Sequence, residues 1–114
     1  MAEFEIKRGR KQFRFNLKAD NGRKILSSET YQAKSSAKKG VDSVKVNAKK
    51  DENFERRTSS DGKPYFVLKA TNGEIIGRSQ LYSSTGAMEK GIESVKKNAR
   101  RAKVSDEEPF LDSV

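Results

Sequence analysis

Basic side chains at regular spacing are the residues of this chain that could support a binding chemistry. In the first 18 residues they alternate with apolar side chains, and from residue 34 to 49 they recur at helical spacing. Lysine and arginine arranged on one face can contact successive phosphates of a polyanion. The candidates are Lys7, Arg10, Arg14, Lys18, Lys38, Lys45 and Lys49.

The formal charge of +9 lies entirely in the first half of the chain. Residues 1–50 contain 14 Lys or Arg and 5 Asp or Glu, whereas residues 51–114 contain 11 of each class. A basic balance favours nucleic acid or another polyanion, but it equally serves solubility. Proteins that bind single strands also use aromatic stacking platforms, and the pattern turns only Tyr65 outward. A solvated sheet face therefore stays an alternative.

Catalytic chemistry has little support in the residue types. The chain has no cysteine and no histidine, which excludes disulfides, thiolate or imidazole metal sites and Ser-His or Cys-His catalysis. A Ser-x-x-Tyr pair occurs at Ser28–Tyr31 and again at Ser79–Tyr82 without a base at a recognised spacing. Capping and a buried ring explain these residues, so we predict no enzyme, no cofactor and no metal.

A repeat positions these residues. Phe15 to Tyr31 returns 51 positions later as Phe66 to Tyr82, and 16 of 34 aligned positions are identical between 15–48 and 66–99. The centre of each copy is Asn-Gly, at Asn21-Gly22 and Asn72-Gly73, which is typical of a type I′ turn. We interpret both dipeptides as structural hairpin turns and not as binding loops.

Hydrophobic periodicity predicts the remaining elements. A period of two indicates strands over 4–8, 12–18, 24–29, 54–58, 65–70 and 74–80, with a short last strand at Val104. A period of 3.6 indicates helices from Ser35 or Ser36 and from Ser83 or Ser84, the second running to about 102. Glycine within a helix costs about 1 kcal/mol relative to alanine, so Gly40 and Gly91 indicate close approach of helix to sheet.

The repeated residues resemble the YegP-like family, a small bacterial and archaeal domain of unknown function. The matching motifs are Phe-x-Leu-Lys-Ala-x-Asn-Gly, Ser-x-x-Tyr, and the helical Gly-Val-Asp-Ser-Val-Lys and Gly-Ile-Glu-Ser-Val-Lys. The resemblance implies an α+β fold of two β-β-β-α-β units. These units would share a single antiparallel sheet, with two helices packed on one face and the C-terminal strands exchanged between repeats. It brings no established activity, catalytic residue or cofactor.

The resemblance also implies one pseudo-symmetric domain over residues 1–105, with repeat 1 at about 3–53 and repeat 2 at about 54–105. Such a tandem chain would fold as a monomer. We expect the acidic segment 106–114 to be a flexible tail. No signal segment and no apolar run of membrane-spanning length occurs in the sequence, which favours a cytoplasmic protein.

Two functions follow as hypotheses. The first is a non-enzymatic binding or structural module that meets a protein partner through the open sheet face or an edge strand. It is favoured by Tyr65 and Val67, which we expect to be outward where the first copy has Arg14 and Asn16. The alternative is weak, sequence-independent nucleic-acid binding through the basic first repeat.

Overall fold

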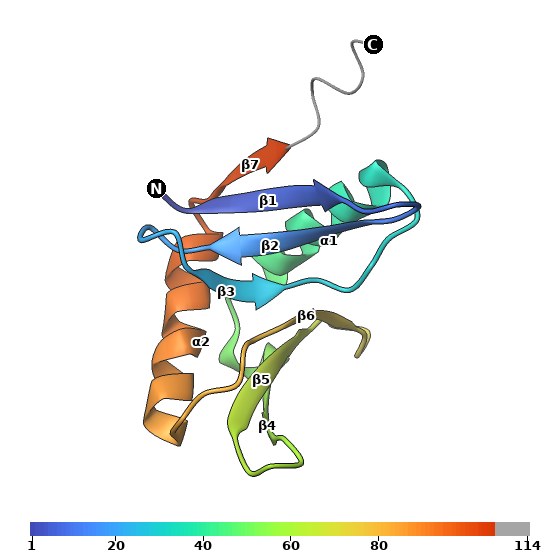
Figure 1. The fold of residues 1–114 in the computed structure, drawn as a ribbon. Coiled ribbons are helices and arrows are strands. Elements are labelled where there is room, and N and C mark those ends of the chain that lie inside the picture. The colour runs from blue at the N-terminus through green and yellow to red at the C-terminus, as the bar shows by residue number, and fades with distance from the viewer. Residues whose placement is uncertain (107–114) are drawn as a thin grey trace.

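A computed structural model of the chain describes residues 1–106, and the expected acidic tail beyond Asp106 lies outside the described residues. Both repeats contribute to one sheet with the strand order β4-β5-β6-β3-β2-β1-β7. Figure 1 shows the two helices on one side of this sheet. In chain order the elements are β1 Glu3–Arg8, β2 Phe13–Lys18, β3 Lys24–Ser27, α1 Lys34–Asn47, η1 Asp51–Asn53, β4 Phe54–Thr58, β5 Pro64–Lys69, β6 Ile75–Arg78, α2 Thr85–Ala99 and β7 Lys103–Asp106.

The repeats meet at equivalent positions, because Ser27 of β3 pairs with Arg78 of β6 in antiparallel register. The last strand of the second repeat, β7, pairs with β1 of the first repeat, with Glu3 opposite Lys103. This pair is parallel, which the sequence did not predict. In the first repeat the counterpart of β7 is the 3-10 helix η1, which runs directly into β4. The second repeat therefore gives its C-terminal strand β7 to the first repeat, whereas the first repeat gives no such strand in return.

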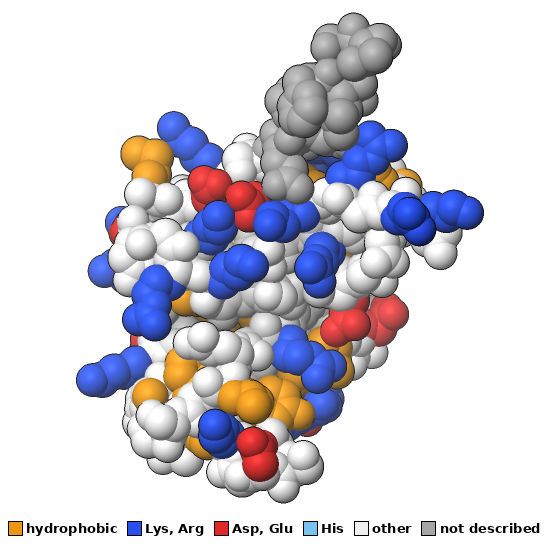
Figure 2. Space-filling model, viewed as in Figure 1, with side chains coloured by type: hydrophobic (Ala, Val, Ile, Leu, Met, Phe, Trp, Pro, Cys, Tyr) orange, Lys and Arg blue, Asp and Glu red, His pale blue; other side chains and the backbone are white. Residues whose placement is uncertain are grey.

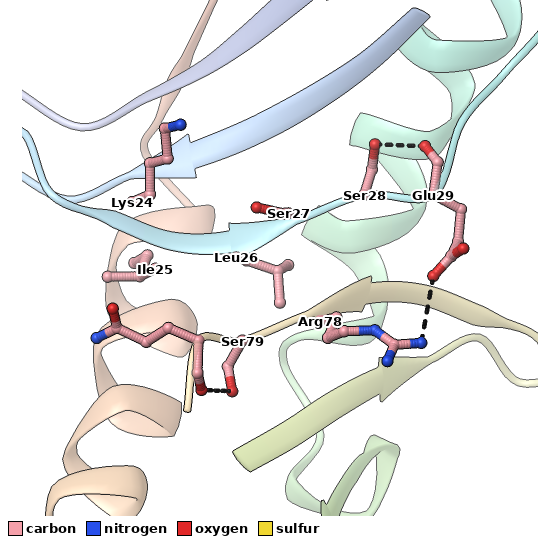
Figure 3. A pocket seen from close by; sticks show the side chains of 9 residues that line it. Lys24, Ile25, Leu26, Ser27, Ser28, Glu29, Arg78 and Ser79 are labelled. Atoms are coloured by element: carbon pink, nitrogen blue, oxygen red, sulfur yellow. Dashed lines mark hydrogen bonds and ion pairs between the residues drawn. The ribbon is translucent and has the colours of Figure 1, made fainter. Parts of the chain in front are cut away.

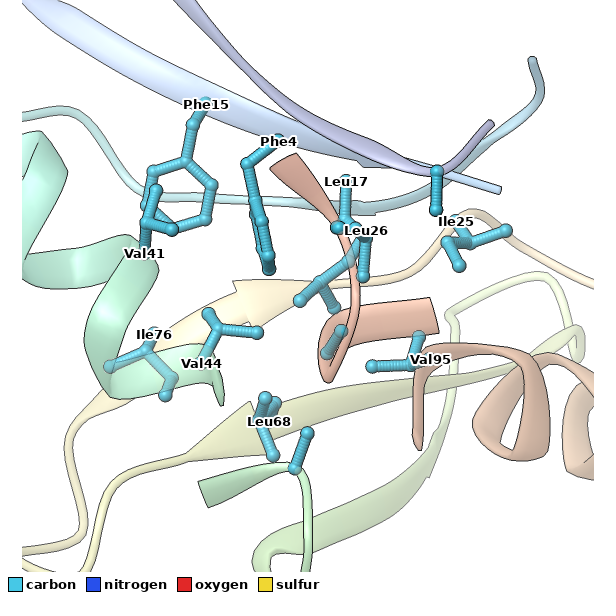
Figure 4. Close-up of a cluster of buried hydrophobic side chains, with 14 of the residues drawn as sticks. Phe4, Phe15, Leu17, Ile25, Leu26, Val41, Val44, Leu68, Ile76 and Val95 are labelled. Atoms are coloured by element: carbon cyan, nitrogen blue, oxygen red, sulfur yellow. The ribbon is translucent and has the colours of Figure 1, made fainter. Parts of the chain in front are cut away.

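The core lies between the sheet and the helices (Figure 4). In β1, β2, β3, β5 and β6 alternate apolar residues turn toward α1 and α2 and are almost fully buried, as the period of two predicts. The outer strands contribute less, since β4 adds only Phe54 and Val104 of β7 is exposed. Phe15 packs edge-on against Phe4 with ring centroids 5.9 Å apart and stacks on Tyr31 at 6.2 Å. The second repeat reproduces this group with Phe54, Phe66 and Tyr82.

The hairpin turns are in the predicted places, but their type differs from the prediction. A type I′ turn needs positive φ at both central residues, whereas within residues 1–106 only glycines have positive φ, with Gly22 at 84° and Gly73 at 89°. The N–H of Gly22 donates to the carbonyl of Ala19 over 2.9 Å, and the N–H of Ala19 donates to Arg23 over 2.9 Å. The turn is a three-residue loop that ends in glycine, so asparagine keeps a negative φ.

The helix starts were half correctly predicted. Ser84 caps α2, because its hydroxyl accepts a hydrogen bond from the N–H of Ala87 over 3.1 Å. The first helix begins at Lys34 after Ala33, which has no side-chain capping bond, so the prediction of Ser35 or Ser36 as cap was wrong. The second helix ends at Ala99, earlier than expected.

An ion-pair network ties η1 to β4 and α2. Asp51 accepts from Lys96 over 2.8 Å and from Arg56 over 3.2 Å, and Arg56 also donates to Glu89 over 2.8 Å. The hydrogen bonds from Lys96 and Arg56 lower the pKa of Asp51 to about 2. Since this is below the ordinary value of 3.8, the ionised Asp51 stabilises the fold above that value, and its contribution is lost as the pH falls toward 2.

We expect Asp51→Asn to lower the midpoint of urea unfolding at pH 7, and we expect the difference from the parent chain to shrink as the pH falls from 4 to 2. Protonation of Asp51 removes the same charge that the variant lacks. Urea titrations between pH 2 and 7 measure both effects. Asp42→Asn, on the exposed side of α1, is the control and should show no such convergence. A difference that is the same at every pH would contradict the assignment.

Candidate polyanion-binding face

The side of the sheet that the helices leave uncovered, called the open face here, is built from the other alternate residues of each strand. Backbone register places one row of these residues straight across all seven strands. The row consists of Glu55, Val67, Arg78, Ser27, Asn16, Glu5 and Ser105. The open face is therefore a single surface that spans both repeats.

Basic side chains dominate this surface. Figure 2 views it from the side opposite the helices and shows lysine and arginine side chains gathered over β1, β2 and β3. Three glutamates, Glu3, Glu5 and Glu55, share the face with them. The bases that register places on the open face are Lys7, Arg14, Lys18, Lys24, Arg57, Lys69, Arg78 and Lys103.

The first repeat contains two cross-strand pairs of like charge. Lys7 lies opposite Arg14, and Lys18 lies opposite Lys24. At the corresponding positions of the second repeat, Arg57 lies opposite Tyr65 and Lys69 lies opposite Ile75. Like charges directly opposite each other destabilise a sheet. The first repeat thus keeps two unfavourable pairs that the same backbone avoids in the second.

Carboxylates compensate these charges unequally. Glu55 forms ion pairs with both Arg57 and Lys69 of the second repeat. In the first repeat Glu5 pairs with Lys18 over 3.2 Å. Among the residues that the structure describes, Lys7, Arg14 and Lys24 form no ion pair, so their charge is available to a ligand.

The structure separates the predicted basic residues into two groups. Lys7, Arg14 and Lys18 come together on the open face, and Arg10 is exposed in the β1–β2 turn. Lys38 and Lys45 of α1 lie on the helix side of the sheet, and Lys49 follows two residues after the end of that helix. On this side the Lys45 ammonium lies 5.8 Å from the ring centroid of Phe4. Lys49 lines a shallow pocket whose other lining residues are Glu93, Lys96 and Lys97 of α2 and the following Arg100.

Sequence reasoning missed Lys24 and Arg78 as members of the open face. Both are exposed and lie in short strands after a turn. The length of the hairpin loop could have revealed Lys24, because a three-residue loop places Lys24 opposite Lys18. Arg78 could not have been found in this way, since its neighbour Ser27 belongs to the other repeat.

The position of Val67 shows that the predicted interaction face was wrong in one respect. The alternation correctly turns its side chain away from the helices, but the side chain is completely buried. It lies between Glu55 and Arg78 on the neighbouring strands, and long polar side chains cover apolar neighbours with their aliphatic stems. Tyr65 is half-buried. The pair therefore does not form the exposed apolar patch that we predicted.

A cavity of about 490 Å³ opens on the line where the two repeats meet. Figure 3 shows Ile25 and Leu26 of β3 beside the gap, with Arg78 of β6 extending toward Glu29. The Arg78 guanidinium is 3.9 Å from the Glu29 carboxylate. Serine hydroxyls and the side chains of Lys24 and Gln80 complete the lining.

Two other kinds of site have no counterpart in the described residues. Within residues 1–106, no cluster of three or more carboxylate, histidine or cysteine side chains could hold a metal ion. Neither of the α-helices in this range has the length and apolar character needed to cross a membrane.

Comparison with known proteins gives a consistent result. A model for a domain of unknown function, DUF1508, matches residues 10–55 and 59–106. The UPF0339 protein YegP of Escherichia coli is 52% identical over 95 residues, which cover 83% of this chain and 86% of that protein. A UPF0339 protein of Pseudomonas aeruginosa is 49% identical over 107 residues, covering 93% and 97%.

Solved structures agree with the fold. The solution NMR structure of YegP from E. coli superimposes with a TM-score of 0.87 at 48% identity, covering 93% of this chain and 92% of that one. That of a UPF0339 protein from Shewanella oneidensis gives 0.86 at 42% identity, covering 92% and 90%. The tandem repeat, the α+β sheet and these similarities show that the chain belongs to the UPF0339 family, the YegP-like proteins with tandem DUF1508 domains.

Proposed function

We propose that this protein binds nucleic acid without sequence preference, through the open face of its first repeat. It would act as a non-enzymatic, cytoplasmic monomer that needs no cofactor. The observation that carries the proposal is the pair of opposed cations, Lys7 with Arg14 and Lys18 with Lys24. A bound anion would relieve a repulsion that the free sheet tolerates.

The spacing of the two pairs favours a polymer of phosphates over a single phosphate. Arg14 and Lys18 are four residues apart on β2, which corresponds to roughly 14 Å at about 3.4 Å per residue. One phosphate cannot reach both pairs, whereas a nucleic-acid backbone offers phosphates along its whole length. Contacts of this kind position a backbone and carry no sequence information.

A protein partner on the open face is the weaker candidate. Figure 2 shows hydrophobic side chains on the part of this face that belongs to the second repeat, and half-buried Tyr65 is among its residues. The burial of Val67 removes most of the apolar surface on which that hypothesis depended. The free edge strand β4, Phe-Glu-Arg-Arg-Thr, is mostly charged, as edges that resist strand addition usually are.

The two repeats supply their own test. Arg14→Tyr combined with Lys24→Ile gives the first repeat the residues of the second at the same positions. We expect affinity for labelled single- and double-stranded DNA and RNA to fall about tenfold at low salt, and the salt slope to fall by up to about 2, because two phosphate contacts are lost. The free energy of unfolding should rise by roughly 0.2–1 kcal/mol for each like-charge pair that the substitutions remove.

The control removes the same charge from the helix side. Lys38→Tyr combined with Lys49→Ile alters one exposed residue of α1 and one exposed residue just after it, and this double variant should leave binding nearly unchanged. If both double variants lost affinity equally, the loss would follow from net charge alone, and the assignment of binding to the open face would be wrong. Absence of binding to every nucleic acid at low salt would reject the proposal.

A further inference from the structure

The line where β3 meets β6 is the weakest joint of the sheet. The two strands share a single register pair, Ser27 with Arg78, whereas each of the other neighbouring strands shares at least three. The strands diverge on leaving this pair, and the cavity of about 490 Å³ lies along β3 and the end of β6 (Figure 3). It belongs to the open face, since Ser27 and Arg78 stand in the row that crosses that face.

The floor of the cavity is apolar. Leu26 and Ile25 line it and are 1% and 8% exposed. Their arrangement depends on a difference between the repeats, because Gly77 is the counterpart of Leu26. A Cβ atom at Gly77 would lie 2.7 Å from Cδ2 and from Cγ of Leu26. Leu26 therefore occupies the space that a side chain at position 77 would need, and together with Ile25 it closes the bottom of the cavity.

The rim of the cavity carries the planar guanidinium of Arg78, the ammonium group of Lys24 and the amide of Gln80. The Arg78 side chain is 51% exposed, and its contact with Glu29, at 3.9 Å, is longer than a hydrogen bond. Lys24 is exposed at the other end of the lining and Gln80 is exposed beside Ser79. The hydroxyl of Ser79 is already engaged, because it accepts from the N–H of Phe66 and donates to the carbonyl of Gln80.

We propose that this cavity takes the base of one nucleotide of the bound strand, an inference that rests on the proposed nucleic-acid binding. The base enters the cavity above Leu26 and Ile25 and stacks against the exposed Arg78 guanidinium, and its phosphate meets Lys24. Arginine planes stack on splayed bases in single-stranded nucleic acids. A cavity of this size suits a ligand of nucleotide dimensions. The ligand class is therefore a single strand with an unstacked base.

Arg78→Lys tests the inference, because it keeps the positive charge and removes the planar group. The probes are labelled octauridine and an inorganic polyphosphate of similar charge, which has no bases. We expect the variant to weaken octauridine binding about tenfold, the loss of one stacked base, and to leave polyphosphate binding within a factor of two. The matched control is Arg57→Lys, an ion-paired arginine of the open face outside the cavity, which should change neither.

Backbone NMR adds the location. Uridine monophosphate should shift the amide signals of residues 25–27 and 78–80 in preference to those of β4. If Arg78→Lys weakens binding of both probes equally, or of neither while both still bind, the base site is rejected and the basic open face stands. If neither probe binds the parent chain at low salt, the proposed function fails together with this inference.

Discussion

Residues 1–50 expressed alone will be unfolded at neutral pH. In the intact chain α1 packs on β5 and β6 of the second repeat as well as on its own strands, and β7 of the second repeat covers the edge of β1. The fragment loses both partners and exposes β3 as a second free edge. A single unit of this length cannot bury enough apolar surface to offset its conformational entropy. Circular dichroism and amide NMR spectra of the fragment measure the outcome.

Self-association will not rescue this fragment efficiently. Two copies would have to meet at β3, so Leu26 of one copy would face Leu26 of the other where the intact chain has Gly77. An added fragment of residues 51–106 supplies that glycine together with β7. We expect the mixture to form a folded one-to-one complex by size-exclusion chromatography. A folded monomer of residues 1–50 would refute the shared-core architecture, and a stable homodimer would refute the role given to Gly77.

The repeat made much of this fold predictable. Each strand and each α-helix was predicted within a few residues, because alternation and helical periodicity depend on local sequence alone, whereas the 3-10 helix η1 was not predicted. The turn type was wrong because Asn-Gly suits both a two-residue loop and a longer one, and only the hydrogen bonds of Ala19 and Gly22 distinguish them. The parallel pairing of β7 with β1 joins residues about 100 positions apart, and no local pattern encodes it.

The candidate site was predictable only in part. Alternation assigned Lys7, Arg14 and Lys18 to the open face, since all three belong to one hairpin. Alternation says which way a side chain turns and not what covers it, so the burial of Val67 was missed. The cavity at the joint of the repeats depends on the contact of Leu26 with Gly77, which periodicity cannot reveal.

Gly40→Ala will destabilise the protein, although alanine is the better helix former. A Cβ atom at Gly40 would lie 2.8 Å from Cζ of Tyr31 and 2.9 Å from Cε2 of Phe15, and closer still to the Tyr31 hydroxyl. The helix gains about 1 kcal/mol from the substitution, whereas overpacking a rigid core costs about 1–3 kcal/mol or more. Since both aromatic rings are fixed by stacking and both contacts are shorter than 3.0 Å, we expect a cost of about 3 kcal/mol. The net loss of stability is then about 2 kcal/mol, a fall of roughly 10 °C in Tm.

The second repeat provides both a replicate and a control in one helix. Gly91 meets Tyr82 in the same way, with Cζ at 2.7 Å from a Cβ atom, so Gly91→Ala should also destabilise. Gly86, five residues before Gly91 in α2, would place its Cβ 3.9 Å from Oγ of Ser84, which is an ordinary contact. Gly86→Ala should therefore leave the free energy of unfolding unchanged or raise it by up to about 1 kcal/mol, and Tm should stay the same or rise.

The tyrosine ring can be removed in steps to show that it causes the loss. Tyr31→Phe deletes the hydroxyl, the atom nearest to Gly40, but keeps Cζ, so it should recover part of the stability of Gly40→Ala. Tyr31→Ala deletes the ring, so of these close contacts the one with Phe15 remains. In double-mutant cycles with Gly40→Ala, the coupling energy between positions 31 and 40 should therefore be larger for Tyr31→Ala than for Tyr31→Phe. If the effects of positions 31 and 40 were simply additive, the close approach of Tyr31 to the helix would not be the reason for the glycine.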